Sequence, residues 1–271
     1  MKRSRSNSHK ASYARSSIAL LTDFGISDHY VGTVKGVIHS IHSQATIIDI
    51  THEVQPQQVR QAGYLLWAAY KYFPKGTVFL SIVDPGVGTN RRILAVRTKN
   101  YVFIAPDNML LDAVLSEEQI VEAVEINMTS KNPYIFSPVS NTFHGRDIFA
   151  PVTAYLAAGI SFNEIGKSIA LHPAMSPFVE SESKPVKGEV LHIDRFGNVI
   201  TNLRGRKTAP FSLKIAGKTI HTWINNYAEA PEQTVCLIHG SSGLVEIVVK
   251  NGNAKQKLKA EIASEISFSW K

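Results

Sequence analysis

The sequence predicts an α/β N-terminal domain with a mostly parallel central sheet, followed by an all-β C-terminal barrel. Over residues 18–158, short apolar runs alternate with amphipathic stretches, as strands alternate with helices in α/β domains. Residues 171–185 are rich in proline and acidic side chains, which is typical of a linker. Beyond them, short strand-like runs are separated by turn signals, and no long helical pattern is present.

The N-terminal elements follow from the apolar runs and from helix start and stop signals. Asp28 is placed to cap a helix over residues 29–43. Pro56 suits the first turn of a second helix, which ends near Pro74. The predicted strands cover residues 18–22, 45–49, 78–83, 93–97 and 102–105.

The C-terminal part predicts a small barrel or sandwich, because its strand-like runs are joined by the turn sequences RFGN, AGK, GSSG and KNGN. Its predicted strands cover residues 188–194, 199–201, 211–215, 235–238 and 244–249. The predicted organisation is a disordered basic tail over residues 1–17, the α/β domain over 18–170, the linker over 171–185 and the barrel over 186–271.

The positive charge of the chain is concentrated in its N-terminal tail, so it does not indicate a nucleic-acid partner for the rest of the chain. The chain has 271 residues, with 29 Lys and Arg against 22 Asp and Glu, for a formal charge of +7. Such a charge first suggests a nucleic-acid or membrane-surface partner. Five of the seven excess charges lie in the acid-free tail, so the rest of the chain is nearly neutral. We expect no nucleic-acid partner.

The sequence carries few signals that indicate a cellular compartment. The single cysteine, Cys236, excludes an intramolecular disulfide framework. No apolar run approaches the ~18 residues of a membrane span, and no apolar core follows the basic start as it would in a secretory signal. We expect a soluble, cytoplasmic protein without a membrane partner.

Four aspartates follow predicted strands: Asp23, Asp49, Asp84 and Asp107. Ligands of open α/β sheets bind beyond the carboxyl ends of the strands, so these acids could line one pocket. Solvated turn residues are the alternative.

Two segments carry residues suited to chemistry. In VDPGVGTNRR, Asp84 and Arg91 flank a turn and can converge on one point, although a structural ion pair would have the same spacing. In TFHGRDIFAP, His144 precedes an apolar helix, where a helix-entry histidine is the alternative. His39 and His42 have no third ligand at a recognised spacing, so no metal site is predicted.

These residues stand within a wider resemblance. Seven ordered segments resemble the adenosine-forming S-adenosyl-L-methionine hydrolases, which are relatives of the enzymes that make fluorinated and chlorinated adenosine. The resemblance covers residues 18–254. The segments are LTDFGISDHYVGTVKGVI, IIDITHEV, GTVFLSIVDPGVGTNRR, APDNMLL, FHGRDIFAPV, DRFGNVITN and SSGLVEIVVKNGNA.

The resemblance implies the same two-domain fold and a homotrimer whose active sites lie between subunits. It implies hydrolysis of S-adenosyl-L-methionine to adenosine and L-methionine, without a metal or redox cofactor. The residues that match family positions are Asp84, Arg91 and His144 for the reacting water, Asp23 for the ribose hydroxyls, Asp28, Asp194 and Ser242 for the methionine end, and Asn198 with the backbone near Ala254 for adenine.

The chemistry fits these residue types. A sulfonium leaves as a neutral thioether, so its departure needs no general acid, and catalysis has to align a water molecule and manage its proton. Arg91 keeps its own proton and can stabilise developing hydroxide, which leaves Asp84 and His144 to fix the water or take its proton. The sequence does not choose between them.

Two alternatives remain. One is a halogenating transferase, although the halide-using relatives have no acid at the position of Asp84, where a carboxylate would repel halide. The other is a non-catalytic protein that binds an adenosyl ligand or, through its tail, RNA. One departure concerns the local turn, because Met109 stands where the family usually has glycine.

Overall fold

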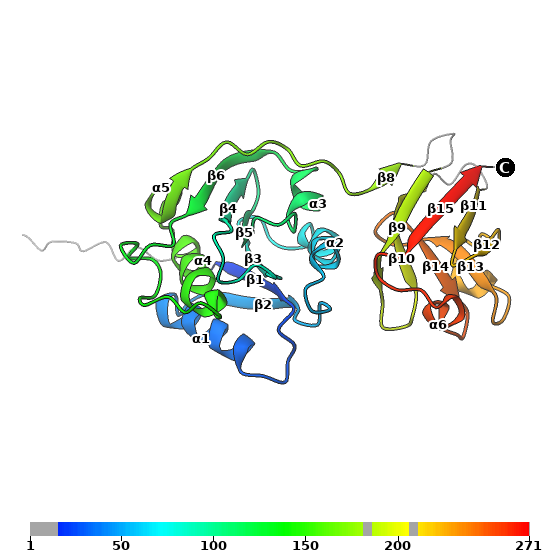
Figure 1. The fold of residues 1–271 in the computed structure, drawn as a ribbon, viewed down its shortest axis with the longest axis horizontal. Helices are drawn as coiled ribbons and strands as arrows, with labels where there is room; N and C mark the ends of the chain where they lie inside the picture. The colour runs from blue at the N-terminus through cyan, green and yellow to red at the C-terminus, as the bar shows by residue number, and fades with distance from the viewer. Residues whose placement is uncertain (1–15, 181–185, 206–210, 271) are drawn as a thin grey trace, which may run out of the picture. The chain divides into compact units, whose positions relative to one another are not determined.

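The computed structural model describes residues 16–180, 186–205 and 211–270, which divide into two compact units (Figure 1). The first unit holds the described residues up to 53, with 73–107 and 120–171, and the second holds 54–72, 108–119 and those from 172 onward. Most of the predicted tail and residues 181–185 of the predicted linker lie outside the described residues. The domain boundaries at residues 170 and 186 stay a prediction.

The first unit is built on one seven-stranded sheet with the order β2-β1-β3-β5-β4-β6-β7. Its strands are β1 (Ser17–Thr22), β2 (Thr46–Thr51), β3 (Val78–Ile82), β4 (Ile93–Thr98), β5 (Val102–Pro106), β6 (Ile120–Ile126) and β7 (Gly166–Ser168). Its helices are α1 (Tyr30–Ile41), the π-helix η1 (Gly145–Phe149), α4 (Ala150–Ala157) and α5 (Phe162–Ile165). Helix α4 packs on β1 and β3, and α1 packs on α4 (Figure 1).

The expectation of a mostly parallel sheet is correct for one half of the sheet and wrong for the other. Strands β2, β1, β3 and β5 pair in parallel. Strand β4 pairs antiparallel with β5 and β6, and β6 pairs antiparallel with β7. The reason is the length of one connection. Only residues 99–101 separate β4 from β5, whereas a parallel crossover needs a dozen residues or more.

Two helix starts differ from their predictions. Helix α1 begins at Tyr30 with His29 at the N-cap, and no side chain caps it, so Asp28 does not have the capping role expected from the sequence. Helix α2 (Val59–Tyr70) begins three residues after Pro56. The cause lies in Gln57, whose φ of +66° is incompatible with a helical turn.

The second unit contains α2, α3 (Asp112–Leu115) and a nearly closed, barrel-like antiparallel sheet with the order β12-β11-β15-β9-β10-β14-β13. Among the described strands, the short strand β8 pairs with β10 in parallel. The elements are β8 (Val179–Glu180), β9 (Val186–Ile193), β10 (Val199–Arg204), β11 (Phe211–Ile215), β12 (Lys218–Ile220), the 3-10 helix η2 (Tyr227–Glu229), β13 (Val235–His239), β14 (Leu244–Val249), α6 (Ala254–Leu258) and β15 (Glu265–Trp270).

Helix α6 is absent from the all-β prediction for this part of the chain. Asn253 occupies its N-cap, and the Asn253 side chain accepts a hydrogen bond from the Gln256 amide. A five-residue helix is too short to show a helical hydrophobic period, but NxxQ is a capping pattern that the sequence does display.

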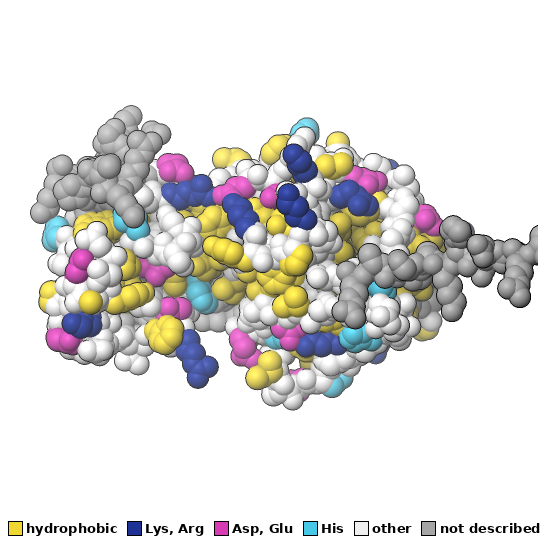
Figure 2. Space-filling model, turned by 180° about the vertical axis from the view of Figure 1, so that it is seen from behind, with side chains coloured by type: hydrophobic (Ala, Val, Ile, Leu, Met, Phe, Trp, Pro, Cys, Tyr) yellow, Lys and Arg dark blue, Asp and Glu magenta, His cyan; other side chains and the backbone are white. Residues whose placement is uncertain are grey.

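Each unit has its own core. In the first, Leu20, Leu80 and Ile104 of neighbouring strands pack with Val34 and Ile38 of α1. In the second, the inward-facing residues of β10, β13 and β14 form the centre of the barrel. Among the described residues no helix is both long enough and apolar enough to cross a membrane. On the face in Figure 2, basic and acidic side chains are interspersed, as the nearly neutral body suggests.

Candidate active site

The loop between β3 and β4 brings an acid and a guanidinium together. Asp84 lies two residues after β3, and Arg91 two residues before β4. The loop turns on itself through a hydrogen bond from the Val87 amide to the Asp84 carbonyl at 3.2 Å. Gly88 has a φ of +79°, and a Cβ there would lie 2.5 Å from the Asn141 carbonyl oxygen. Glycine is therefore required at this turn.

Asp84 and Arg91 form a buried ion pair. The Arg91 Nε atom donates to both carboxylate oxygens of Asp84 at 2.7 Å, and Arg91 Nη2 donates to Asp84 Oδ2. The two side chains are only 6% and 11% exposed. Removing one partner would leave an unpaired buried charge, so this pair holds the guanidinium in a fixed orientation.

His144 joins the pair from the start of η1. Its Nδ1 atom lies 3.0 Å from Arg91 Nη2. Because a guanidinium only donates, Nδ1 is the acceptor and the ring proton is on Nε2. Burial lowers the pKa of His144, and the Arg91 charge lowers it further, while Asp84 and Asp147 act in the opposite direction. His144 is therefore a neutral imidazole that presents an N–H donor.

One donor of this cluster is left over. The Nη1 atom of Arg91 is buried and has no hydrogen-bond partner among the described residues. A buried cationic N–H without an acceptor is costly, and it gains stability when an electron-rich oxygen binds it. The cluster of Asp84, Arg91 and His144 is suited to hold a water molecule and to stabilise the charge that develops when this water loses its proton.

The loop after β1 approaches the same cluster. It carries Asp23, which is half-buried, and Asp28, which is exposed. Its Phe24 ring lies 6.1 Å from the ring of Phe143, the residue before His144, and Tyr30 lies 5.0 Å from Phe143. This aromatic contact brings the Asp23 loop next to the His144 segment.

Two of the four strand-end aspartates are engaged elsewhere. Asp49 lies within β2 and not after it, and pairs with Lys35 at 2.6 Å and with His52 at 3.2 Å. Asp107 accepts from Arg92 Nε at 2.8 Å. Both side chains are at the surface, with exposed fractions of 39% and 31%, so they act as ordinary surface ion-pair partners.

The remaining predicted residues lie in the second unit. The Asp194 carboxylate accepts hydrogen bonds from the Phe196 amide at 2.9 Å, the Asn198 amide at 2.8 Å and the Asn198 side chain at 2.8 Å. These bonds close the turn of DRFGN between β9 and β10. The buried Ala254 begins α6, which is tied to this turn by a bond from the Lys255 amide to the Gly197 carbonyl.

A cavity of about 840 Å³ opens beside this turn. Asp194 and Asn198 line it, whereas Ser242 and Ala254 are not among its lining residues. Ser242 lies in the turn between β13 and β14, where it contacts the Tyr64 side chain. Sequence reasoning missed several lining residues, whose types alone gave no signal. They are Tyr64, His192, Phe196, Tyr227 and Glu246.

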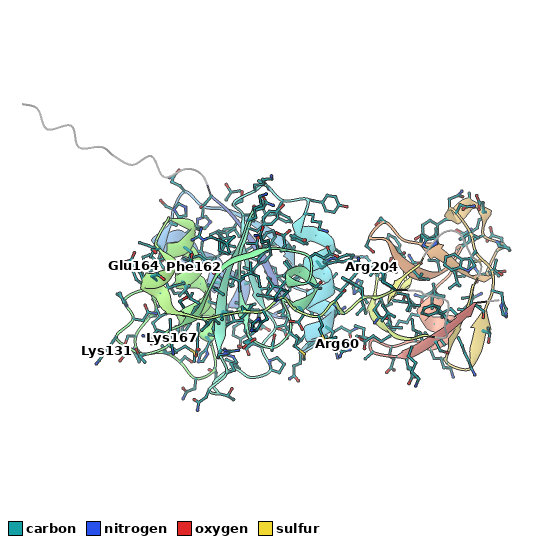
Figure 3. All side chains as sticks on the ribbon, turned by 90° about the horizontal axis from the view of Figure 1, so that it is seen from above. Arg60, Lys131, Phe162, Glu164, Lys167 and Arg204 are labelled. Atoms are coloured by element: carbon teal, nitrogen blue, oxygen red, sulfur yellow. The ribbon has the colours of Figure 1, made fainter. Side chains whose placement is uncertain are left out.

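A second cavity, of about 750 Å³, is separate from the predicted site. It lies in the first unit between the end of β6, residues 127–133 and β7, and it contains none of the predicted site residues. Lys131, Glu164 and Lys167, labelled in Figure 3, are part of its lining. Among the residues the structure describes, no three His, Cys, Asp or Glu side chains are grouped as metal ligands.

Models of known protein families match both the N-terminal and the C-terminal part of the chain. Residues 18–166 match the model of the SAM hydroxide adenosyltransferase N-terminal domain, and residues 188–267 match that of the C-terminal domain. The chain is 34% identical to the (R)-S-adenosyl-L-methionine hydrolase of Thermus thermophilus, covering 89% of this chain and 94% of the relative. It is 32% identical to the fluorinase of an Actinoplanes species, covering 69% and 71%.

A solved structure agrees with these matches. An uncharacterized conserved protein from Thermotoga maritima has a TM-score of 0.82 and 35% identity to this chain, covering 93% of this chain and 99% of that one. Family models and relatives thus agree over nearly the whole described chain. This protein belongs to the SAM hydroxide adenosyltransferase family.

Proposed function

We propose that this protein hydrolyses S-adenosyl-L-methionine to adenosine and L-methionine. Relatives from Thermus thermophilus, Salinispora arenicola and Methanocaldococcus jannaschii, at 32% to 36% identity, are all named (R)-S-adenosyl-L-methionine hydrolase. The observation that carries the proposal is the buried cluster of Asp84, Arg91 and His144 with its unused Arg91 Nη1 donor. Water is the nucleophile that such a cluster can bind and activate.

In the proposed reaction, a water oxygen attacks the ribose 5′ carbon in line with the bond to sulfur. The new C–O bond forms while the C–S bond breaks. The electron pair of the C–S bond stays with sulfur, which leaves as the neutral thioether of methionine. Arg91 Nη1 stabilises the charge that develops on the water oxygen. His144 Nδ1 already accepts from Arg91, so we assign the departing proton to a free lone pair of the Asp84 carboxylate.

We assign the substrate-binding roles as the family positions suggest. Asp23 accepts from the ribose hydroxyls, Asp28, Asp194 and Ser242 face the methionine end, and Asn198 with the Ala254 backbone holds adenine. Support for the adenine end comes from the cavity, which Asn198 lines beside Asp194. We also propose a cytoplasmic homotrimer with active sites between subunits, for which sedimentation should give three times the mass of one chain.

The direct test is incubation of purified protein with S-adenosyl-L-methionine and separation of the products by chromatography. Adenosine and methionine should appear in equal amounts and well above spontaneous breakdown. Binding of the substrate without adenosine release would instead identify a non-catalytic ligand-binding protein. Formation of a halogenated nucleoside in chloride or fluoride would identify the transferase alternative, which the Asp84 carboxylate disfavours by repelling halide.

Replacement of the proposed proton acceptor gives a sharper test. The variant Asp84→Asn keeps the shape of the side chain but removes its charge and basicity. We expect kcat to fall by about 100-fold or more with KM changed less than threefold, because the lost interaction is made mainly in the transition state. Asp107→Asn is the matched control, since Asp107 also follows a strand and pairs with an arginine. Equal losses in kcat and binding for Asp84→Asn would contradict its role.

A further inference from the structure

A buried histidine outside the predicted site residues is bonded to both sides of Asp23. Strands β1 and β2 pair in parallel, so Thr22 at the end of β1 lies beside His52, which follows β2. The His52 Nδ1 atom lies 2.9 Å from Thr22 Oγ1, and the same oxygen accepts a hydrogen bond from the Phe24 amide at 3.2 Å. The His52 carbonyl accepts from the Gly25 amide at 2.8 Å. The residues before and after Asp23 are therefore tied to His52.

The His52 ring is itself held in one orientation. It is only 5% exposed, and its Nε2 atom, which has no hydrogen-bond partner among the described residues, faces Asp49 Oδ1 at 3.2 Å. Burial acts to raise the pKa of Asp49, but the interactions with Lys35 and His52 lower it below the ordinary value, so Asp49 is a carboxylate. A carboxylate only accepts, so we assign the ring proton to Nε2. This leaves Nδ1 to accept from the Thr22 hydroxyl.

These bonds shape the backbone at Asp23. Thr22 donates its hydroxyl proton to His52 and uses a lone pair for the Phe24 amide, which fixes the turn of the chain after β1. A carboxylate that receives two vicinal hydroxyl groups has to be held at a fixed angle, because hydrogen bonds weaken steeply as they bend. Groups that do not touch the ligand commonly provide this orientation.

A second histidine of the same unit has the same kind of bond in a different place. His42 is also 5% exposed, and its Nε2 atom lies 2.7 Å from the Ser16 hydroxyl. Ser16 precedes β1, whereas Thr22 ends it. His42 thus ties the start of the strand, away from Asp23, and shows what a purely structural histidine–hydroxyl bond looks like here.

We propose that His52 is a positioning residue, which orients the Asp23 carboxylate toward the ribose hydroxyls of the substrate. Its side chain acts through Thr22 and the Phe24 amide and does not need to touch the substrate. This assignment rests on the proposed function for the identity of the substrate and for the role of Asp23. It predicts that loss of the His52 ring weakens recognition of the ribose hydroxyls more than binding of the rest of the ligand.

The test compares two ligands, S-adenosyl-L-methionine and its analogue without the two ribose hydroxyls. Binding is measured by calorimetry in the full chain with Asp84→Asn, so that turnover does not consume the ligand. This parent protein should bind the natural ligand about tenfold or more tightly than the analogue, as expected for hydrogen bonds to a carboxylate. His52→Leu should lower this ratio at least threefold, while the affinity for the analogue changes less than twofold.

Two further variants separate positioning from stability. His52→Asn offers a side-chain oxygen to Thr22 in place of Nδ1 and should keep most of the ratio. His42→Leu, the matched control, removes an equally buried histidine and should keep all of it. Equal losses of the ratio in His42→Leu and His52→Leu would mean that both act only by weakening the fold, and the assignment would be wrong.

Thr22→Val tests the route of the effect and replaces His52→Leu if that variant does not fold. It removes the hydroxyl that His52 binds and should lower the ratio to a similar extent. The double variant should lose no more than the larger single loss, because both changes break one chain of bonds. An unchanged ratio in either single variant, or a ratio near one in the parent protein, would overturn the assignment.

Adenosine release by the unaltered enzyme is scored separately. Its absence would refute the proposed hydrolysis, whereas the binding ratios would still decide whether His52 positions Asp23.

Discussion

At the scale of single residues, the structure indicates the protonation state of His144, which the sequence left open. From the sequence, His144 could take the water proton or merely begin a helix. The 3.0 Å contact between its Nδ1 and Arg91 Nη2 makes it a neutral acceptor toward arginine and an Nε2–H donor toward its other side. His144 thus orients the guanidinium, and its protonation would break that contact.

This state predicts the acidic limb of the pH profile. The pKa of His144 lies below the ordinary histidine value of 6.5, because of burial and the Arg91 charge. We expect kcat/KM to stay level as pH falls from 8 to 6.5 and to decline only below that, as His144 becomes protonated and repels Arg91. In His144→Asn, whose side-chain oxygen can replace Nδ1 as acceptor, this limb should disappear. A limb centred above pH 6.5 would contradict the neutral assignment.

Met109 departs from the residue that the resemblance implies, and we expect this departure to lower the free energy of unfolding. Its φ of +72° lies in the left-handed region, where glycine is favoured, in agreement with the glycine that the resemblance implies at this position. The same side chain is exposed and lines a cavity of about 280 Å³ with Arg60 and Asp112. The departure therefore affects a pocket wall of the second unit, and not the cluster of Asp84, Arg91 and His144.

Met109→Gly should raise the free energy of unfolding by about 0.5 kcal/mol, since relief of the left-handed strain slightly exceeds the extra entropy of an unfolded glycine. Urea denaturation measures this change. Met109→Ala is the control, because it removes the exposed side chain but keeps the Cβ atom that causes the strain. A gain of the same size in both variants would show that the side chain, and not the backbone, is responsible.

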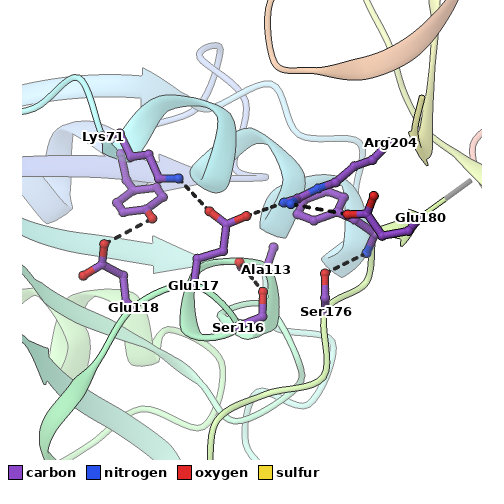
Figure 4. Close-up of polar contacts among 10 residues, drawn as sticks. Lys71, Ala113, Ser116, Glu117, Glu118, Ser176, Glu180 and Arg204 are labelled. Atoms are coloured by element: carbon purple, nitrogen blue, oxygen red, sulfur yellow. Dashed lines mark hydrogen bonds and ion pairs between the residues drawn. The ribbon is translucent and has the colours of Figure 1, made fainter. Parts of the chain in front are cut away.

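At the scale of elements, a network of charges connects α2, α3 and the barrel strands of the second unit (Figure 4). Glu117, which follows α3, accepts from Lys71 at 2.6 Å and from Arg204 Nη2. The Arg204 guanidinium also lies 4.7 Å from the Phe178 ring and 5.6 Å from the Trp67 ring. Planar stacking and paired donation are properties of arginine that lysine does not share.

Arg204→Lys should therefore lower the free energy of unfolding by about 1 kcal/mol, although it keeps the charge. The loss is read from chemical denaturation of the full chain. Lys187→Met provides the comparison, because Lys187 pairs with Glu265 at 2.7 Å on a highly exposed surface, where an ion pair contributes little. Equal effects of the two substitutions would mean that the rings and Glu117 add nothing to the binding of Arg204.

At the scale of the whole molecule, the placement of the positive charges says more about binding partners than the net charge does. Five of the seven excess positive charges belong to the first 15 residues. Deleting residues 1–15 should leave kcat and KM within twofold of their original values and should lower any salt-sensitive binding to RNA. Activity assays and RNA titrations at two salt concentrations measure both effects. A KM that rises severalfold on deletion would place the tail at the active site.

The two-part fold could be predicted from apolar periodicity, which is a local property, whereas the grouping of Asp84, Arg91 and His144 was implied by the resemblance to a known family. The sequence did not predict the direction of β4, which depends on a three-residue connection. Nor did it reveal Glu246, since one acid in an apolar strand gives no hint of what it faces. The hydrogen bonds that occupy Asp194 were equally hidden, because they depend on the geometry of a folded turn.

The reversed direction of β4 has a consequence for how the nucleophile is selected. Strand β3 ends and β4 begins at the same edge of the sheet, so the loop of residues 83–92 leaves and re-enters one edge. Had β4 run parallel, its start would lie about 17 Å away, the length of a five-residue strand, and Arg91 could not reach Asp84. Two of the three groups proposed to handle water, Asp84 and Arg91, thus belong to one short loop, whose exchange would replace both of them without rebuilding the sheet.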